Sequence, residues 1–375
     1  MSEPARMLPR ASTSPLTLIA APLAVVVASA VGALRWGTTD TINLSGAALA
    51  ACLPVLLVAL CPLGWWGARR SGGAEIRFSD RAVLDRAARV DLVMLDRWGT
   101  VTTGELKASA VDPVDAGHEQ NLRWFAGALG HAAGDPIGRA LARLSTRGRV
   151  SGVEHVEGLG TTGSVDRHPV QYGLPHWVGV AERPGIGTQV AVKVDGRPLG
   201  YVTVADEVRP RAEASVAALR DGGLEPVLVS DDNAANTEHL AQTCGIDSWH
   251  SDSAPEKHGR LVEETRERGR VVAYTGSHHE PLGAADVAIR VAGDTSSPGA
   301  SGIEMIDLDV ERVVRALAIA CASAAASRRS RIVGIACTTA LLGLTVSGVV
   351  GLVPTLIASA LAAGATAVSG LAMRV

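Results

Sequence analysis

The apolar residues of this chain are concentrated near its two ends. Residues 16–34 form an uncharged run, and a second uncharged run extends from Thr41 to Ala68. No charged residue lies between Ile332 and Met373, and Gly351 and Pro354 interrupt that segment. About 20 apolar residues are enough to cross a bilayer as a helix. The pattern therefore predicts four transmembrane helices, two in residues 1–70 (about 16–34 and 44–66) and two in residues 328–375.

Arginine residues flank these runs on one side of the expected membrane: Arg6, Arg10, Arg69, Arg70, Arg328, Arg329 and Arg331. Positively charged flanks stay in the cytoplasm, so both termini and the long central block are expected there. A cleaved signal peptide explains the first run less well, because a second apolar run follows closely. We therefore expect a multi-pass integral membrane protein, with the lipid bilayer as a partner.

The central block, residues 71–327, alternates strand-like and helix-like segments. Short apolar runs typical of buried strands occur at residues 90–95, 226–230, 271–274 and 287–291. Helical periodicity separates them, for example in Arg211–Gly223 and in Asn236–Gly245. This alternation predicts an α/β fold with a doubly wound parallel sheet. Residues 106–204 change to short alternating strands, which predicts an inserted α+β domain between residues 71–105 and 205–327.

Composition narrows the possible functions. The 375 residues are 47% hydrophobic, and their formal net charge is −3. Because nucleic-acid binding needs a basic excess, no nucleic-acid partner is expected. The five cysteines are scattered, so they do not form a disulfide framework.

Asp96 stands at the end of the first predicted strand of the central block, before a Gly/Thr-rich segment. Ligands of open parallel sheets gather at the carboxyl ends of the strands. A carboxylate in this place can act as a nucleophile toward a phosphoryl group. An aspartate at a turn is also common as a structural residue, so the local string alone leaves both interpretations open.

Several segments together resemble the P-type ATPases, specifically the heavy-metal-transporting type. "VDLVMLDRWGTVTTGEL" resembles the phosphorylation segment DKTGTLT, and "AGDPIGRAL", "GLGTTG", "ADEVRPRA" and "VLVSDDN" resemble later family motifs in the family's order. "LCPLG" resembles the membrane Cys-Pro-Cys region. The resemblance implies a haloacid-dehalogenase-like phosphorylation domain interrupted by a nucleotide-binding domain, with ATP as ligand. It assigns catalytic roles to Asp96, Thr100, Ser230 and Lys257, nucleotide contacts to Asp135, Gly158 and Gly160, and a metal contact to Cys61.

The departures from the family pattern concern its magnesium site. An ungapped comparison with the GDGxND motif puts Tyr274 and His278 at the two aspartate positions, whereas a one-residue gap puts Thr275 and His279 there. Neither comparison leaves a carboxylate, so Mg²⁺ binding is expected to be impaired. Asp231 and Asp232 either add negative charge at the site or cap the next helix.

Further departures from the family motifs also indicate impaired catalysis. Arg97 and Trp98 replace the Lys-Thr pair after the nucleophile, and Leu63 replaces the second cysteine of Cys-Pro-Cys. An ungapped comparison puts His258, rather than Lys257, at the phosphate-contacting lysine. The interval of residues 69–95 is too short for an actuator domain, so we expect that domain to be missing.

The departures from the family motifs favour a pseudo-ATPase with a regulatory or scaffolding role. Its expected partner is an intact pump or another membrane protein. The first alternative is a working cation-transporting ATPase that forms an aspartyl phosphate on Asp96. The second alternative is a membrane interaction module without a nucleotide site. The residues around Asp96 discriminate between the first two hypotheses.

Overall fold

The computed structural model describes residues 38–61, 63–183, 185–251, 255–293, 302–347 and 350–371. The chain divides into two compact units. One comprises Met1–Ala88 and Ala316–Val375, and the other comprises Arg89–Arg315. The first predicted transmembrane segment, residues 16–34, lies outside the described residues.

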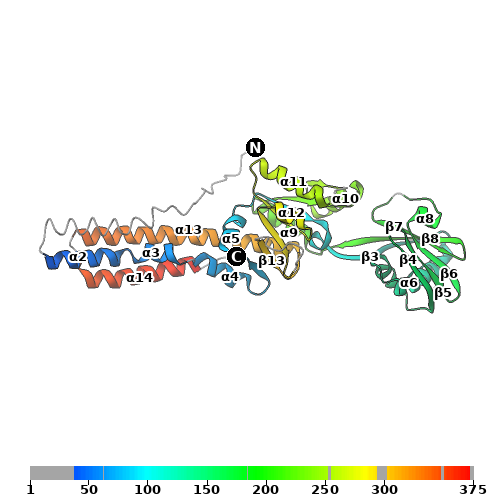
Figure 1. The fold of residues 1–375 in the computed structure, drawn as a ribbon, viewed down its shortest axis with the longest axis horizontal. Helices are drawn as coiled ribbons and strands as arrows, with labels where there is room; N and C mark the ends of the chain where they lie inside the picture. The colour runs from blue at the N-terminus through cyan, green and yellow to red at the C-terminus, as the bar shows by residue number, and fades with distance from the viewer. Residues whose placement is uncertain are drawn as a thin grey trace. The chain divides into compact units, whose positions relative to one another are not determined.

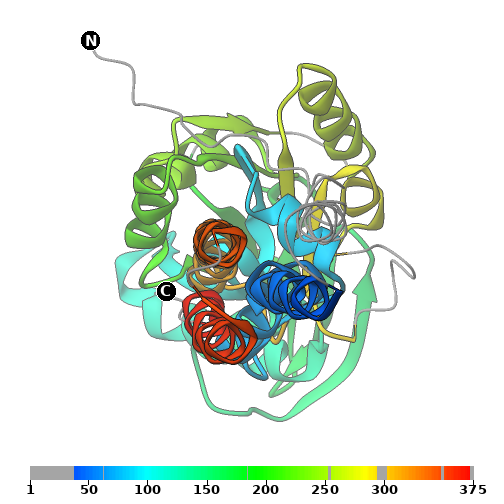
Figure 2. The same cartoon turned by 90° about the vertical axis from the view of Figure 1, so that its left-hand side faces the viewer.

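The first unit is built mainly of long helices, with a short strand β1 (Ile76–Phe78) and a short helix α5 (Arg81–Ala87). Its helices are α2 (Thr38–Ala51), α3 (Leu53–Leu60), α4 (Leu63–Gly72), α14 (Leu352–Leu371) and most of α13 (Val310–Val346). Helix α14 packs against α2, α3 and α4 (Figures 1 and 2). The described residues between α3 and residue 92 form α4, β1 and α5.

The second predicted transmembrane segment, residues 44–66, is interrupted twice. Helix α2 ends at Ala51, and α3 has Pro54 within its first turn. Cys61 is extended, with φ −100° and ψ 122°, and separates α3 from α4. A proline lacks an amide hydrogen and clashes with the preceding turn, which explains why helices begin at such positions.

The helix α14 has polar side chains inside and apolar side chains outside. Thr355, Ser359 and Thr366 are fully buried, whereas Leu361 is 72% exposed and Val368 is 67% exposed. A soluble helix bundle has the opposite distribution, so this face suits a lipid environment.

Two helical segments in the described part of the chain are long and apolar enough to cross a membrane: Asn43–Gly72, which comprises most of α2 with α3 and α4, and Leu352–Ser369. The expected third segment forms the last part of α13 and is not among them. The count of four transmembrane helices stays a prediction.

The second unit contains a parallel sheet with the strand order β13-β12-β11-β2-β9-β10. Strand β2 (Leu92–Asp96) lies between β11 (Val272–Thr275) and β9 (Glu225–Val229). The other strands are β10 (Ser248–His250), β12 (Val287–Val291) and β13 (Gly302–Met305). The helices between them are α9 (Ala212–Asp221), α10 (Ala234–Cys244), α11 (Pro255–Glu267) and α12 (His279–Ala284). The predicted α/β fold with a parallel sheet is confirmed.

An antiparallel sheet forms the inserted part of the same unit, with the strand order β3-β8-β7-β6-β5-β4. Its strands are β3 (Thr102–Pro113), β4 (Val150–Val156), β5 (Gly160–Val165), β6 (His168–Gly173), β7 (Thr188–Val194) and β8 (Arg197–Val208). Its helices are α6 (Glu119–Ala133), α7 (Pro136–Ala142) and α8 (Pro175–Val178), with a short 3₁₀ turn at Ala116–His118.

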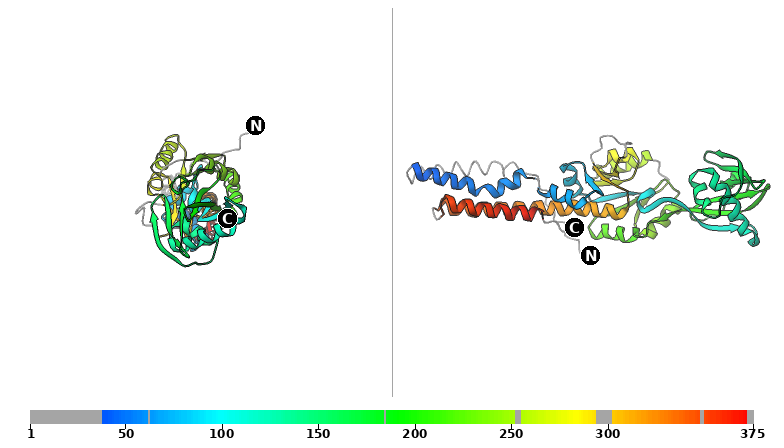
Figure 3. Two further views of the ribbon diagram at one scale, coloured as in Figure 1. Left: turned by 90° about the vertical axis from the view of Figure 1, so that its right-hand side faces the viewer. Right: turned by 90° about the horizontal axis from the view of Figure 1, so that it is seen from below.

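Leu122 and Leu129 of α6 pack on Val192 and Val202 in the core of this sheet. The long strands β3 and β8 pair from Thr102 with Val208 to Pro113 with Gly200, and they lead from the parallel sheet into the antiparallel one (Figure 3).

Candidate functional site

Asp96 is the last residue of the central strand β2, and its side chain is buried. All five residues of β2 are buried, and the residue as a whole is 2% exposed. The tight turn Arg97–Val101 follows, in which Gly99 has a φ of +72° that favours glycine. The backbone amides of Arg97 and Trp98 donate to the Asp96 carboxylate. Burial raises the pKa of Asp96 to about 6, against the lowering effect of His278 and of the two amides.

The residues after β11 surround this carboxylate. The hydroxyl of Tyr274 lies 3.5 Å from Asp96 Oδ2, and His278 Nε2 lies 3.7 Å from the same oxygen. A Cβ atom on Gly276 would stand only 2.9 Å from Asp96 Oδ2, so the backbone of β11 approaches the carboxylate closely. Tyr274, Gly276 and His278 therefore occupy the space beside the expected nucleophile.

The register of β11 distinguishes the two comparisons with the GDGxND motif. Thr275 pairs with Leu95, and Tyr274 pairs with Met94. Side chains alternate across a strand, so Tyr274 shares the face of Asp96 and Thr275 has the opposite face. His279 is exposed. The side chains that reach Asp96 are those of the ungapped comparison, Tyr274 and His278.

Helix α11 contributes a histidine rather than a lysine to this cluster. His258 is 2% exposed, and its Nδ1 lies 3.5 Å from the Tyr274 hydroxyl. Its ring centre lies 6.3 Å from that of His278. Lys257 is exposed, because one residue on a helix rotates a side chain by about 100°. The structure therefore does not bring Lys257 together with Asp96.

Two hydroxyl residues with predicted catalytic roles lie at the same sheet edge. Ser230 directly follows β9, whose Val229 pairs with Asp96, and Ser230 is fully buried. Its Oγ accepts a hydrogen bond from the Asp232 amide at 3.1 Å. The hydroxyls of Thr100 and Thr275 are buried and have no hydrogen-bond partner within the described residues. A buried unpaired hydroxyl is uncommon, so this edge of the sheet holds two polar groups without a partner in the described part of the chain.

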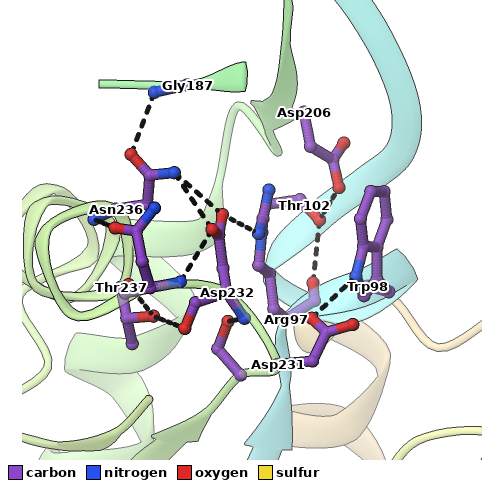
Figure 4. Close-up of polar contacts among 11 residues, drawn as sticks. Arg97, Trp98, Thr102, Gly187, Asp206, Asp231, Asp232, Asn236 and Thr237 are labelled. Carbon is purple, nitrogen blue, oxygen red and sulfur yellow. Dashed lines mark hydrogen bonds and ion pairs between the residues drawn. The ribbon is translucent and has the colours of Figure 1, made fainter. Parts of the chain in front are cut away.

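Arg97 and Trp98 connect the turn after Asp96 to the loop after β9 (Figure 4). Arg97 forms an ion pair with Asp232, and Trp98 Nε1 donates to Asp231 Oδ1 at 3.2 Å. The Arg97 guanidinium also lies 4.8 Å from the Trp98 ring centre. Both aspartates are thus engaged by this chain's own side chains.

The contacts of Asp232 extend to the inserted domain. Asn236 Nδ2 donates to both Asp232 oxygens at 3.0 and 3.1 Å, and Asn236 Oδ1 accepts from the Gly187 amide at 2.9 Å (Figure 4). Asn233, rather than either aspartate, caps helix α10 by accepting from the Asn236 amide. The cap interpretation of Asp231 and Asp232 is therefore wrong: they bind the Trp98 and Arg97 side chains.

Arg209 is a structural residue of the site whose contacts the motif "ADEVRP" did not reveal. Its guanidinium donates to the Gly99 carbonyl at 2.8 Å and to the Thr102 carbonyl at 3.1 Å. It also pairs with Asp309 at 3.1 Å. Nearby, Asp206 accepts from the hydroxyl of Thr102 and from the Gly104 amide. These contacts hold the turn after Asp96 in its conformation.

The residues at this edge do not fit a magnesium site. Mg²⁺ prefers carboxylate and water oxygens in octahedral geometry. Beside Asp96, β11 and the segment after it present a phenol, a glycine and an imidazole, and Asp232 is paired with Arg97. A protonated His278 would supply positive charge without metal ligands.

The predicted nucleotide contacts lie in the inserted domain. Asp135 caps α7: its Oδ1 accepts from the Gly138 amide at 2.7 Å. Its Oδ2 accepts from the Tyr172 hydroxyl at 2.8 Å and from the Thr161 hydroxyl at 3.3 Å. Burial raises the pKa of Tyr172, with Asp135 acting in the same direction. Asp135 is thus occupied by internal hydrogen bonds.

The two glycines of the Gly-x-Gly segment have different surroundings. Gly158 has a φ of +74°, and a Cβ atom there would meet open space. Gly160 has a φ of +156°, and a Cβ atom would stand 2.2 Å from the Tyr172 carbonyl and 2.6 Å from the Trp177 ring. Gly158 therefore leaves its backbone accessible, whereas Gly160 is required by packing.

Cys61 lies at the end of α3 and is partly exposed. Within the described residues, no group of three or more His, Cys, Asp or Glu side chains could hold a metal ion. The metal contact of Cys61 stays a prediction.

Comparison with known proteins identifies the class of this fold. The haloacid dehalogenase-like hydrolase family matches residues 90–284, and the chain belongs to this family. The catalytic domain of the CPx-ATPase CopB-B matches 65% of the chain, with a TM-score of 0.55 and 19% identity. A crystal structure of a zinc-transporting PIB-type ATPase in the E2.Pi state matches 98% of this chain and 64% of its own, with a TM-score of 0.77 and 19% identity.

Within this class, the curated relatives are P-type ATPases. A copper-exporting P-type ATPase of Mycobacterium tuberculosis is 31% identical over 79% of this chain and 42% of its own length. A copper-exporting P-type ATPase of Mycobacterium leprae is 33% identical over 62% of this chain and 32% of its own length. The predicted resemblance to heavy-metal P-type ATPases is thus confirmed. The chain spans less than half the length of these curated relatives.

Proposed function

We propose that this chain is a membrane-anchored pseudo-ATPase, which keeps the P-type ATPase fold around Asp96 but does not form an aspartyl phosphate. The observation that supports this proposal is that Tyr274 and His278 stand beside Asp96 at the two positions where the family motif has carboxylates. A fold retained without its metal ligands suits a regulatory or scaffolding role, with an intact pump or another membrane protein as partner.

The chemistry of phosphoryl transfer explains why this replacement matters. The family's transfer relies on a divalent ion that bridges phosphate oxygens and neutralises their developing charge. Tyr274 offers Asp96 one hydroxyl, and His278 offers at most one positive charge. Arg97 and Trp98 fill the turn after Asp96 and engage Asp231 and Asp232. Asp232 is therefore held in an ion pair with Arg97, and Asp231 has one oxygen engaged by Trp98.

The membrane anchoring proposed here rests on the helices of the first unit. Two described helices satisfy the length and hydropathy of a transmembrane span, and α14 exposes its apolar side chains. We propose that the protein is multi-pass, with its central domain and both termini in the cytoplasm. The relatives' names specify copper export in two cases and potassium transport in another, so a transported cation is not specified for this chain.

One observation favours the alternative of an active cation-transporting ATPase. Asp96, Thr100 and Ser230 all lie at the carboxyl edge of the parallel sheet, and within the described residues the Thr100 hydroxyl has no hydrogen-bond partner. The hydrogen bonds of Asp135 instead favour the second alternative, a membrane module without a nucleotide site, since they occupy a predicted nucleotide contact. ATP binding, if retained, would use the open backbone at Gly158.

Acid-quench labelling with [γ-³²P]ATP and Mg²⁺ separates these hypotheses. We expect no acid-stable, hydroxylamine-labile label on the full chain, while a copper-exporting relative labels in parallel. Label that disappears in Asp96→Asn would establish the active ATPase. Titration with a fluorescent ATP analogue then separates the remaining two hypotheses, because saturable binding supports the pseudo-ATPase and its absence supports the membrane module.

A further inference from the structure

The exposed surface of α4 changes from aromatic to positively charged along the helix. Trp66 is 51% exposed, and Arg69 and Arg70 are exposed one turn later. Arg69 also lies 5.8 Å from the ring centre of Trp65. The opposite face, with Gly64, Gly67 and Ala68, is buried. Tryptophan next to arginine at the end of an apolar helix is typical of a membrane–water boundary.

Helix α13 shows the same change in the reverse direction. Arg328 and Arg329 are exposed, and one turn later Ile332 is 58% exposed and Ile335 is 47% exposed. From residue 312 to residue 375 the sequence has no acidic residue. The exposed surface of α13 thus passes from cationic to apolar within about one turn, or 5 Å.

A close contact joins α4 and α13 near these arginines. A Cβ atom on Gly64 would stand 2.2 Å from Ser327 Oγ and 2.9 Å from Ser323 Oγ, so α4 touches α13 directly before its arginines. In the described part of the chain, no carboxylate lies within ion-pair distance of Arg69, Arg70 or Arg328. The arginine pairs of α4 and α13 therefore both lie within two turns of this contact, and we call the four residues the basic band.

We infer that this band, formed by Arg69, Arg70, Arg328 and Arg329 with Trp65 and Trp66, binds the phosphodiester headgroups of anionic phospholipids. Guanidinium groups bind phosphate oxygens through paired hydrogen bonds. The apolar side chains beside the band, such as Ile332, would contact the acyl chains of the same lipids. A free phosphate would gain nothing from this apolar surface, which is why the lipid is the occupant that the geometry favours.

Quenching of tryptophan fluorescence by brominated lipids tests this inference on the reconstituted full chain. The measured quantity is the binding constant of brominated phosphatidylglycerol relative to that of brominated phosphatidylcholine. An arginine near an anionic surface contributes roughly a fivefold preference. We expect a preference of at least that size for phosphatidylglycerol, which high salt reduces toward one.

Two variants and one control define the outcomes. Arg69→Gln/Arg70→Gln and Arg328→Gln/Arg329→Gln should each lower the preference several-fold, and either suffices if the other does not fold. Arg147→Gln/Arg149→Gln, an exposed arginine pair of the inserted domain, should leave it unchanged. Equal binding of the two lipids by the unmodified chain would overturn the inference, as would a preference that neither band variant lowers. Competition by inorganic phosphate without any lipid preference would also overturn it and indicate a free anion.

Discussion

Replacing Asp96 by asparagine tests whether the buried carboxylate lacks a cationic partner. Asparagine keeps the shape of the side chain and still accepts hydrogen bonds from the Arg97 and Trp98 amides. It removes the negative charge, which in the native chain is 2% exposed and faces Tyr274 and His278. If no cation compensates that charge, its removal should stabilise the fold wherever Asp96 is ionised.

The pKa of Asp96 gives the size of the effect. Burial raises that pKa from 3.8 to about 6, and one pKa unit corresponds to about 1.4 kcal/mol. For a carboxyl with a raised pKa, the folded state binds the proton more tightly than the unfolded state. The native chain therefore loses stability as the pH rises from 3.8 to 6, up to about 3 kcal/mol above pH 6.

Thermal unfolding of the full chain in detergent, followed by tryptophan fluorescence from pH 4 to pH 8, measures this difference. At pH 8, Asp96→Asn should melt several degrees above the native chain, because 1 kcal/mol shifts the midpoint of a domain of this size by about 2–4 °C. Near pH 4 the two melting temperatures should converge. The opposite result would be an Asp96→Asn variant that melts below the native chain at pH 8 but not at pH 4. That result would show that a cation compensates the charge of Asp96 in the native chain.

Three further predictions concern the same unit. His278→Gln should raise the pKa of Asp96 above about 6, because His278 lowers it. In the same melting series, the upper limit of the pH range over which the fold loses stability should therefore move upward. Gly160→Ala should destabilise the inserted domain by about 1–3 kcal/mol through its clash with the Tyr172 carbonyl. Gly158→Ala, where a Cβ meets open space, is its control and should cost about 1 kcal/mol. Asp135→Ala should cost about 2–4 kcal/mol, since it removes the cap of α7 and leaves the buried Tyr172 hydroxyl without its acceptor. Urea denaturation of each variant, with hydrogen exchange to localise the change, checks the last two, and a loss for Gly158→Ala equal to that for Gly160→Ala would refute the packing argument.

The parallel sheet could be predicted from the sequence because its buried strands are continuous apolar runs. The runs at residues 90–95, 226–230 and 287–291 became β2, β9 and β12. Strands β3 and β8 were harder to delimit, since each has 12 residues and runs past the boundaries expected at residues 106 and 204. Their hydrophobic pattern does not change where one domain meets the next.

The candidate site was only partly predictable, because its composition depends on which side chains share a strand face. The sequence left Tyr274 with His278 and Thr275 with His279 as alternatives, and the pairing of Thr275 with Leu95 separates them. The ion pair of Arg97 with Asp232 joins residues 135 positions apart. No local pattern indicates a contact of that kind, so only the folded chain reveals it.

A calorimetric titration of the full chain with Mg²⁺ tests directly whether the site beside Asp96 has lost its metal ligands. We expect no saturable binding at millimolar Mg²⁺ by the native chain, because Tyr274 and His278 stand where metal ligands are needed. The double variant Tyr274→Asp/His278→Asp restores two carboxylates beside Asp96 and should acquire saturable binding. Saturable Mg²⁺ binding by the native chain that disappears in Asp96→Asn would show that the native site still holds the ion and that the protein is not a pseudo-ATPase for lack of metal.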